Sequence, residues 1–465
     1  MSIFKACDIR GIVGSEWDAA DAARIGRSLG SMLCRRGERW IYLGGDFRRT
    51  TPALKHAVAR GLVEAGVTVY DLGQVPTPVV YFAARSSGCG NVAVVTASHN
   101  PGPYNGIKFM VAGRPAVPAL MDELREGLDT NRWAGARGTV EAREALPSYE
   151  RWVADHAGDV AQVPARDDRR LEEPLAPGRR ARVVLDAMQG AFTYIAPRVL
   201  EARGASVVSR SKELDPDFAA GPPNPAEDAH LAPLIDHLQH EPADLGVALD
   251  GDGDRVIFVS EGGAIARPEQ IAALLIRHGP PRPTVVYDLK CASIVPRAVA
   301  AAGGIGLMRP SGHGFIKTAM IERHADLGVE VSGHHFFAAL DGGDDGLFTA
   351  LVLLDLMGKS GQPLGDLLGP VGWPAITPDL RVPYRGDAAA VVEQIAAACG
   401  GHVSRLDGVR AEYEDGWGLA RASITEPAIT FRFEGRDRAG VRAIASRFLA
   451  GAPELSARVL EMMGE

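Results

Sequence analysis

The sequence predicts an α/β protein with three related α/β domains and a fourth domain of the α+β type. A unit of strand, aspartate, helix, glycine and strand occurs three times, with its aspartate at Asp46, Asp186 and Asp288. Strands that alternate with helices in this way indicate α/β units. From about Pro374 the pattern changes to several strands and a closing helix. A chain of 465 residues is also too long for one core and long enough for three or four domains.

The expected elements follow in chain order from apolar periodicity and from the residues that interrupt it. In the first domain a helix over 21–34 precedes strands at 40–43 and 67–72, which flank a helix over 52–65. The later elements are strands at 183–186, 206–208, 285–288, 305–308, 379–382, 410–413 and within 419–434, with helices over 194–203, 294–302, 388–398 and 438–450. The predicted domains are 1–148, 149–258, 259–372 and 373–465.

The composition excludes several functional classes. A net charge of −8, without a dense block of Lys and Arg, argues against a general nucleic-acid binder. No apolar run is long enough to span a bilayer, and the first residues lack the apolar segment of a signal peptide. The five cysteines are scattered and lack the spacing of metal ligands, so we expect reduced thiols and a cytoplasmic protein.

The first candidate for chemistry is Ser98, in the turn Thr96–Pro101. An apolar strand over 92–95 runs into this turn and leaves Ser98 at the carboxyl end of the strand. Ligands of open α/β sheets bind at that end. A hydroxyl group there is a candidate nucleophile once a base, a metal or prior phosphorylation activates it. The alternative is a serine that only hydrogen-bonds the backbone of its turn.

The second candidate is the aspartate loop Asp250-Gly251-Asp252-Gly253-Asp254, which follows an apolar strand over 245–249. Three carboxylates at alternate positions can surround one hard cation and leave room for water and a phosphate oxygen, which suits Mg²⁺. The loop lacks the twelve-residue layout of an EF-hand. The alternative is an acidic surface turn, in which three close charges would repel one another.

These two stretches and three others resemble the α-D-phosphohexomutases, in particular their phosphomannomutase/phosphoglucomutase branch. The other three are Ala6–Gly11, Glu330–His334 and Arg421–Pro427. The resemblance spans the chain and implies mixed sheets in the α/β domains, with all four domains around a central cleft. It also implies reversible transfer of phosphate between the 1- and 6-positions of a hexose, mannose or glucose, with a hexose 1,6-bisphosphate as activator and intermediate.

The resemblance further implies the roles of individual residues. Ser98 matches the phosphorylated serine, which would bind Mg²⁺ together with Asp250, Asp252 and Asp254. Lys108, Arg10 and Arg255 match catalytic cations, and Lys108 matches the proton shuttle; a lysine in a cationic, partly desolvated site can have a lowered pKa. His99 adjoins the nucleophile, but neighbouring residues on an extended segment point in opposite directions, which favours a structural role for His99.

Two groups of residues are expected to bind the sugar phosphate. The first matches the sugar-contacting stretches of the third domain and comprises Lys290, His313, Glu330, Ser332 and His334. The second matches the clamp for the phosphate that is not transferred and comprises Arg421, Ser423 and Thr425. Ser423 and Glu426 also have the spacing of a helix capping box, which is compatible with anion binding. His334 and His335 could suggest a metal pair, but no third ligand lies nearby in the sequence.

Three departures from the family pattern affect the choice of substrate more than the reaction. Cys7 replaces a tyrosine and removes a hydroxyl group from the rim of the cleft. Val331 replaces a methionine, and Ile424 replaces a polar residue of the phosphate clamp. The alternatives are therefore a phosphoglucosamine mutase, a catalytically weak sugar-phosphate-binding regulator, or a metal-dependent phosphatase. We expect a monomer or homodimer that binds neither nucleic acid nor membranes.

Overall fold

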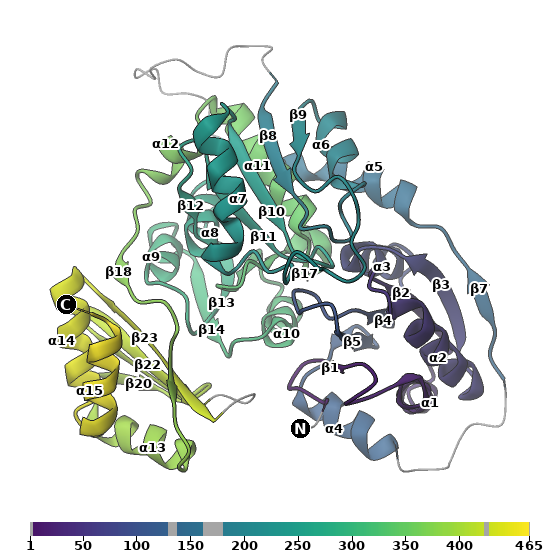
Figure 1. Ribbon diagram of the computed structural model, residues 1–465, viewed down its shortest axis with the longest axis horizontal. Helices are drawn as coiled ribbons and strands as arrows, with labels where there is room; N and C mark the ends of the chain where they lie inside the picture. The colour runs from purple at the N-terminus through teal and green to yellow at the C-terminus, as the bar shows by residue number, and fades with distance from the viewer. Residues whose placement is uncertain (1–2, 129–136, 161–179, 423–426, 465) are drawn as a thin grey trace.

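The computed structural model describes residues 3–128, 137–160, 180–422 and 427–464. Four sheets follow one another along the chain (Figure 1). The first has the strand order β1-β5-β4-β2-β3-β7, with β6 beside β5. Its strands and helices are β1 (Ile9–Ile12), α1 (Ala19–Arg35), β2 (Trp40–Gly45), α2 (Thr51–Glu64), β3 (Thr68–Gln74), α3 (Thr77–Ser86), β4 (Val92–Val95), β5 (Tyr104–Val111), β6 (Arg114–Pro115), α4 (Pro118–Gly127) and β7 (Val140–Ala142).

The second and third sheets have the orders β12-β11-β10-β8-β9 and β14-β13-β15-β16-β17. The elements around the second are α5 (Leu146–His156), β8 (Arg182–Asp186), α6 (Ala196–Ala202), β9 (Ser206–Ser209), α7 (Asp228–His240), β10 (Leu245–Leu249), β11 (Val256–Ser260) and β12 (Ile265–Ala266). Those of the third are α8 (Pro268–Arg277), β13 (Thr284–Asp288), α9 (Ile294–Ala301), β14 (Ile305–Arg309), α10 (His313–Arg323), β15 (Leu327–Val329), β16 (His335–Phe337), β17 (Gly343–Asp344), α11 (Gly346–Ser360) and α12 (Leu364–Leu368).

The first three sheets repeat one topology, as the sequence predicts. The repeated strands are β2–β5, β8–β11 and β13–β16. In each set the first strand lies between the second and the third and is parallel to both, and the fourth is antiparallel beside the third. The aspartate of the repeated unit has the same local role each time. Its Oδ1 accepts a hydrogen bond from the backbone N–H two residues later, at 3.1 Å for Asp46, 2.8 Å for Asp186 and 2.5 Å for Asp288. The three domains are therefore related in their turns as well as in their strand order.

The fourth sheet is antiparallel, in the order β18-β23-β22-β21-β20 with β19 beside β23, which fits the predicted α+β type. Its elements are β18 (Ala375–Ile376), β19 (Leu380–Pro383), α13 (Ala388–Ala398), β20 (His402–Ser404), β21 (Val409–Tyr413), β22 (Gly416–Ala422), β23 (Ala428–Gly435), α14 (Arg438–Phe448) and α15 (Pro453–Met462). The fold class expected from the sequence is confirmed. The exact domain boundaries stay a prediction.

Apolar side chains join the first three domains into one body. One core cluster contains buried residues of all three and includes much of α11, while the first and fourth domains also have clusters of their own. The fourth domain rests on the third (Figure 1), where Leu289 packs with Trp417 and Leu419. The buried Arg410 also donates a hydrogen bond of 3.1 Å to the carbonyl oxygen of Cys291. Among the described residues, no helix is long and apolar enough to cross a membrane.

Two glycines allow α1 and α2 to cross closely. A Cβ atom on Gly61 would lie 2.1 Å from the carbonyl oxygen of Ala23, and one on Gly26 would lie 2.3 Å from that of Val58. Alanine improves helix propensity by about 1 kcal/mol, but here it must push two backbones apart. We therefore expect Gly61→Ala to lower the free energy of unfolding by about 1–3 kcal/mol, measured by urea denaturation.

The control is Gly358→Ala in α11, because a Cβ atom there would meet no heavy atom within 4 Å. That variant should be as stable as the parent or gain up to about 1 kcal/mol. An equal response of both variants would show that the crossing of α1 and α2 does not depend on glycine.

Candidate active site

Three hairpin loops meet at the site, one from each of the first three domains. Each loop connects the third strand of the repeated set to the fourth, antiparallel strand: β4 to β5, β10 to β11, and β15 to β16. The loops carry Ser98, the aspartates of 250–254 and the polar residues of 330–334, respectively. Equivalent loops of three related units thus hold three of the motifs found in the sequence.

Ser98 is oriented towards the aspartate loop. Its Oγ donates a hydrogen bond of 2.6 Å to Oδ2 of Asp250, and the residue is 1% exposed. Its backbone φ is +49°, in the left-handed region that non-glycine residues rarely adopt. The side chain of Ser98 therefore does more than hydrogen-bond the backbone of its own turn.

His99 does not point away from the nucleophile, so that expectation is wrong. Nδ1 of His99 lies 3.1 Å from Oγ of Ser98. The argument assumed an extended segment, whereas the left-handed conformation of Ser98 turns the next residue back towards it. Burial, together with the positive charges of Arg255 and Arg10, holds the pKa of His99 well below its usual value. A neutral His99 is the result at neutral pH.

The three aspartates are buried, so the alternative of an acidic surface turn is wrong. Asp250, Asp252 and Asp254 are at most 1% exposed. One oxygen of each carboxylate lies within 4.8 Å of the others. Burial and the two neighbouring carboxylates raise the pKa of Asp250 to about 7. Charges placed this close need a compensating cation.

Lys108 on β5 supplies one positive charge. Its Nζ lies 2.8 Å from Oδ2 of Asp252 and also pairs with Asp254. Burial favours the neutral amine, but the two carboxylates outweigh it and hold the pKa of Lys108 well above its usual value. The expected lowered pKa is therefore wrong for this arrangement of charges. The sequence argument counted the cations near Lys108 and not the carboxylates.

The remaining oxygens of the loop fit a metal ion. Oδ1 of Asp252 and Oδ1 of Asp254 are buried and have no hydrogen-bond partner among the described residues. An oxygen-only set of carboxylates at this separation suits a hard divalent cation such as Mg²⁺. Asp250 is further fixed by the backbone N–H groups of Gly253 and Arg255, at 3.0 and 3.2 Å.

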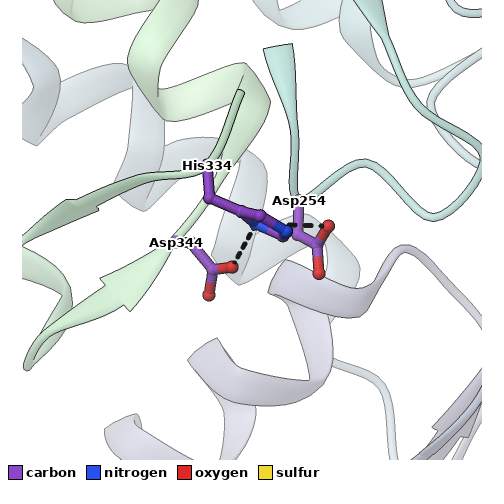
Figure 2. Close-up of side chains that lie close together, drawn as sticks. All are labelled: Asp254, His334 and Asp344. Carbon is purple, nitrogen blue, oxygen red and sulfur yellow. Dashed lines mark ion pairs between the residues drawn. The ribbon is translucent and has the colours of Figure 1, made fainter. Parts of the chain in front are cut away.

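Arg255 and His334 connect the aspartate loop to the third domain. Nε of Arg255 donates a hydrogen bond of 2.9 Å to Nε2 of His334. The other ring nitrogen, Nδ1, lies 2.7 Å from Oδ2 of Asp344 and 3.6 Å from Oδ1 of Asp254 (Figure 2). Because a guanidinium group only donates, Nε2 is the acceptor and the proton of a neutral His334 is on Nδ1, facing the carboxylates.

Asp344 was missed in the sequence. It lies ten residues beyond His334, in β17 at the end of a glycine-containing turn, and the acidic pair Asp344-Asp345 was the only signal. The argument that His334 has no further potential ligands nearby is wrong, because Asp254 and Asp344 reach it through the fold. His335 points elsewhere, towards the carbonyl oxygen of Gly333. The carboxylates around His334 are already paired with Lys108 and Lys317, so we interpret this group as an ion-pair network.

The 330–334 loop has unused hydrogen-bonding capacity. It closes on itself, because the N–H of Glu330 donates to the carbonyl oxygen of His334 and that of Gly333 to the carbonyl oxygen of Glu330, both at 3.0 Å. Oε2 of Glu330 and Oγ of Ser332 are buried without a hydrogen-bond partner among the described residues. Buried polar atoms of this kind indicate a ligand or water.

His313 and Cys7 meet where the first and third domains touch. The ring of His313 lies 6.0 Å from that of His334, and burial and the charge of Lys108 lower its pKa to about 4. Cys7 is buried, and a Cβ atom on Gly314 would lie 2.9 Å from its Sγ. Cys7 therefore packs against the start of α10.

Two other predicted residues are held by partners of their own. Arg10 donates a hydrogen bond of 2.8 Å to Oδ1 of Asn100 in the Ser98 loop and pairs with Asp8. Lys290 forms an ion pair of 2.9 Å with Asp379 at the junction with the fourth domain.

In the fourth domain, Arg421 pairs with Asp407 at 3.0 Å, and its buried Nε has no hydrogen-bond partner in the described part of the chain. Ser423, Ile424 and Thr425 lie outside the described residues. The phosphate clamp that they would complete stays a prediction.

Comparison with known proteins agrees with these motifs. Family models of phosphoglucomutase/phosphomannomutase match residues 1–135, 170–263 and 267–371 as alpha/beta/alpha domains I, II and III, and residues 380–451 as the C-terminal domain. A phosphomannomutase/phosphoglucomutase of Pseudomonas aeruginosa is 36% identical over 441 residues, which cover 93% of this chain and 91% of that protein. A phosphoglucomutase of Neisseria gonorrhoeae is 32% identical over 460 residues, which cover 96% of each.

A solved structure gives the same result. A phosphoglucomutase/phosphomannomutase family protein from Burkholderia thailandensis has a TM-score of 0.86 and 33% identity, with 97% of each chain covered. The four matched domains and these relatives together account for nearly the whole chain. This chain therefore belongs to the phosphoglucomutase/phosphomannomutase family.

Proposed function

We propose that this chain is an isomerase that interconverts hexose 1-phosphate and hexose 6-phosphate, with mannose and glucose phosphates as substrates. The observation that carries the proposal is the Oγ of Ser98, 2.6 Å from Asp250 in a buried group of three carboxylates. A hydroxyl group and a cation site in contact are the parts that a phosphoserine enzyme needs. The names of the relatives support the same activity.

In the proposed reaction, the phosphoryl group leaves Oγ of Ser98 and bonds to the free hydroxyl oxygen of the sugar. The proton that this hydroxyl group loses is balanced by the proton that Oγ of Ser98 takes up. The hexose 1,6-bisphosphate then reorients, and its other phosphoryl group returns to Ser98. Asp250, Asp252, Asp254 and the phosphoserine would hold Mg²⁺, which would neutralise charge on the phosphoryl group. Lys108, whose pKa Asp252 and Asp254 hold above its usual value, would stabilise negative charge on the phosphoryl group or donate a proton.

The sugar phosphate would be bound by two further groups. Glu330 and Ser332 would use their unpaired oxygens to bind sugar hydroxyls, and His313, His334 and Lys290 would contribute further contacts. Arg421 would hold the phosphate that is not transferred, because a guanidinium group matches phosphate oxygens well. The nearby Arg10 and Arg255 would add positive charge around Ser98.

Initial rates with Mg²⁺ and a trace of bisphosphate test the proposal. Mannose 1-phosphate, glucose 1-phosphate and glucosamine 1-phosphate are compared, and free phosphate is followed in parallel. Comparable turnover of the first two sugars is expected, with little free phosphate. Turnover of glucosamine 1-phosphate alone would make the protein a phosphoglucosamine mutase, phosphate release alone a phosphatase, and binding without turnover a regulator.

Asp344→Asn should slow turnover without weakening substrate binding. The amide keeps the size of the side chain but removes the negative charge beside Nδ1 of His334. We expect kcat to fall by roughly tenfold to a hundredfold, the usual range for such supporting residues, while KM stays within about twofold.

The control is Asp341→Asn in the same turn. Asp341 is exposed and has a φ of +51°, a conformation that asparagine accepts readily. Thermal melting of both variants separates local disorder from loss of the fold. An Asp344→Asn enzyme with unchanged kcat would refute the positioning of His334 by Asp344.

A further inference from the structure

Arg48, which belongs to none of the motifs found in the sequence, donates most of its side-chain hydrogen bonds to the Ser98 loop. Its side chain is fully buried. Nη2 donates to the carbonyl oxygens of Ser98 and Asn100, both at 2.7 Å. Nη1 donates to those of Pro101 and Tyr104, at 2.8 and 3.2 Å. One guanidinium group therefore binds four carbonyl oxygens of a seven-residue stretch around the nucleophile.

The fifth N–H of Arg48 is bound by Asp46, the aspartate of the repeated unit in this domain. Nε donates to Oδ2 of Asp46 at 3.1 Å, so all five donors of the guanidinium group are used. The same oxygen accepts a hydrogen bond of 2.8 Å from Oγ1 of Thr96. Oγ1 of Thr96 in turn accepts the N–H of Ser98 at 2.9 Å. Both backbone polar groups of Ser98 are thus fixed by Asp46, one through Arg48 and the other through Thr96.

Ser98 needs this support because its conformation is strained. A serine at φ +49° persists only where its surroundings determine it. Its carbonyl oxygen accepts a hydrogen bond from Arg48, and its hydroxyl group donates one to Asp250. Together these two hydrogen bonds fix the orientation of the backbone and of the side chain. We propose that Arg48 is the positioning residue of the nucleophile, which holds Ser98 in the left-handed conformation and aims its Oγ at the aspartate loop.

The second domain covers this arrangement. The ring of Phe218 lies over the guanidinium group of Arg48, 4.7 Å from its Cζ to the ring centroid. The neighbouring Arg49 donates its N–H to the carbonyl oxygen of Pro216 at 3.1 Å and pairs with Asp217 at the surface. A Cβ atom on Gly102 would lie 1.9 Å from the carbonyl oxygen of Asp217, so the two domains touch directly here. Phe218 thus covers the guanidinium group of Arg48 from the side of the second domain.

The inference extends the proposed function, and Arg48→Lys tests it. Lysine keeps a positive charge beside Asp46, but its three donors lie on one atom and cannot bind four separate carbonyl oxygens. A misplaced nucleophile commonly costs about a hundredfold in rate, so kcat should fall by about that factor while KM for glucose 1-phosphate stays within about twofold. Hydrogen–deuterium exchange should be faster in the peptide over 97–105, a readout that does not depend on any mutase activity.

Arg49→Gln is the matched control, because the side chain of Arg49 is 71% exposed and its ion pair with Asp217 lies at the surface. Its kcat, KM and exchange should equal those of the parent. If Arg48→Lys does not fold, Phe218→Leu is the second variant, because it keeps Arg48 but removes the ring that packs over its guanidinium group. It should also lower kcat and speed hydrogen–deuterium exchange, to a smaller extent.

The outcomes are separable. A lower melting temperature with unchanged kcat and unchanged exchange would make Arg48 a purely structural residue and overturn the proposal. An equal rise of KM and fall of kcat would assign it to substrate binding and overturn it as well. If the parent protein has no mutase activity, the proposed function fails, while the exchange of the 97–105 peptide still decides whether Arg48 orders the loop.

Discussion

Ser98→Ala is expected to abolish transfer of phosphate between the two positions of the hexose. Without Oγ no phosphoenzyme forms, so kcat should fall by roughly three orders of magnitude or more, as when other covalent nucleophiles are removed. Coupled initial rates with glucose 1-phosphate measure the loss. Intact mass spectrometry after incubation with the bisphosphate should show one added phosphoryl group on the parent and none on the variant.

Ser86→Ala is the control for Ser98→Ala, because Ser86 is an exposed serine at the end of α3. It should keep the activity and the phosphoryl group of the parent. Both variants should melt close to the parent, since each loses only one hydroxyl group. Turnover at the parent rate in Ser98→Ala would refute Ser98 as the nucleophile.

Lys108→Met is expected to damage both stability and turnover. The variant leaves Asp252 and Asp254 buried without their ammonium partner. Removal of one member of a buried ion pair costs about 3–5 kcal/mol, so the melting temperature in the presence of a chelator should fall strongly. Loss of a positive charge beside the transferred phosphoryl group should lower kcat by at least about a hundredfold.

Added Mg²⁺ should stabilise Lys108→Met more than the parent, because the variant has fewer charges that compensate the aspartates. Differential scanning calorimetry with and without Mg²⁺ gives both shifts. Lys359→Met, which removes a half-exposed lysine of α11, is the control and should change stability by at most about 1 kcal/mol. A Lys108→Met protein as stable and as active as the parent would show that the carboxylates do not depend on Lys108.

The repeated aspartates predicted the architecture because they have a local role. Asp46, Asp186 and Asp288 each close a turn with a backbone N–H two residues away, so their pattern is visible in sequence. In contrast, α11 gave no amphipathic signal, because it is apolar on nearly all sides and buried in the shared core. Local patterns thus predict units, and they do not reveal an element that is enclosed by its neighbours.

The residues of the site also fall into those that local sequence patterns locate and those that only the fold reveals. Ser98 and the aspartate loop follow strands directly, so strand ends located them. Arg48 and Asp344 act on residues that lie far away in the sequence or in another turn, and only the packing of the loops shows their contacts. The orientation of His99 was predicted wrongly for a further reason. The left-handed conformation of Ser98, which precedes it, cannot be inferred from the residue type.

The three units share one strand order, and each presents a different hairpin loop to the site. The donor serine, the acidic residues and the Glu330–Ser332 segment belong to separate units. A substitution such as Val331, within the Glu330–Ser332 segment, leaves the strand order and the aspartate turns of all three units unchanged. In the proposed function, sugar binding and phosphoryl transfer therefore depend on different loops, so a substitution in one loop can change sugar preference while the other loops keep their residues.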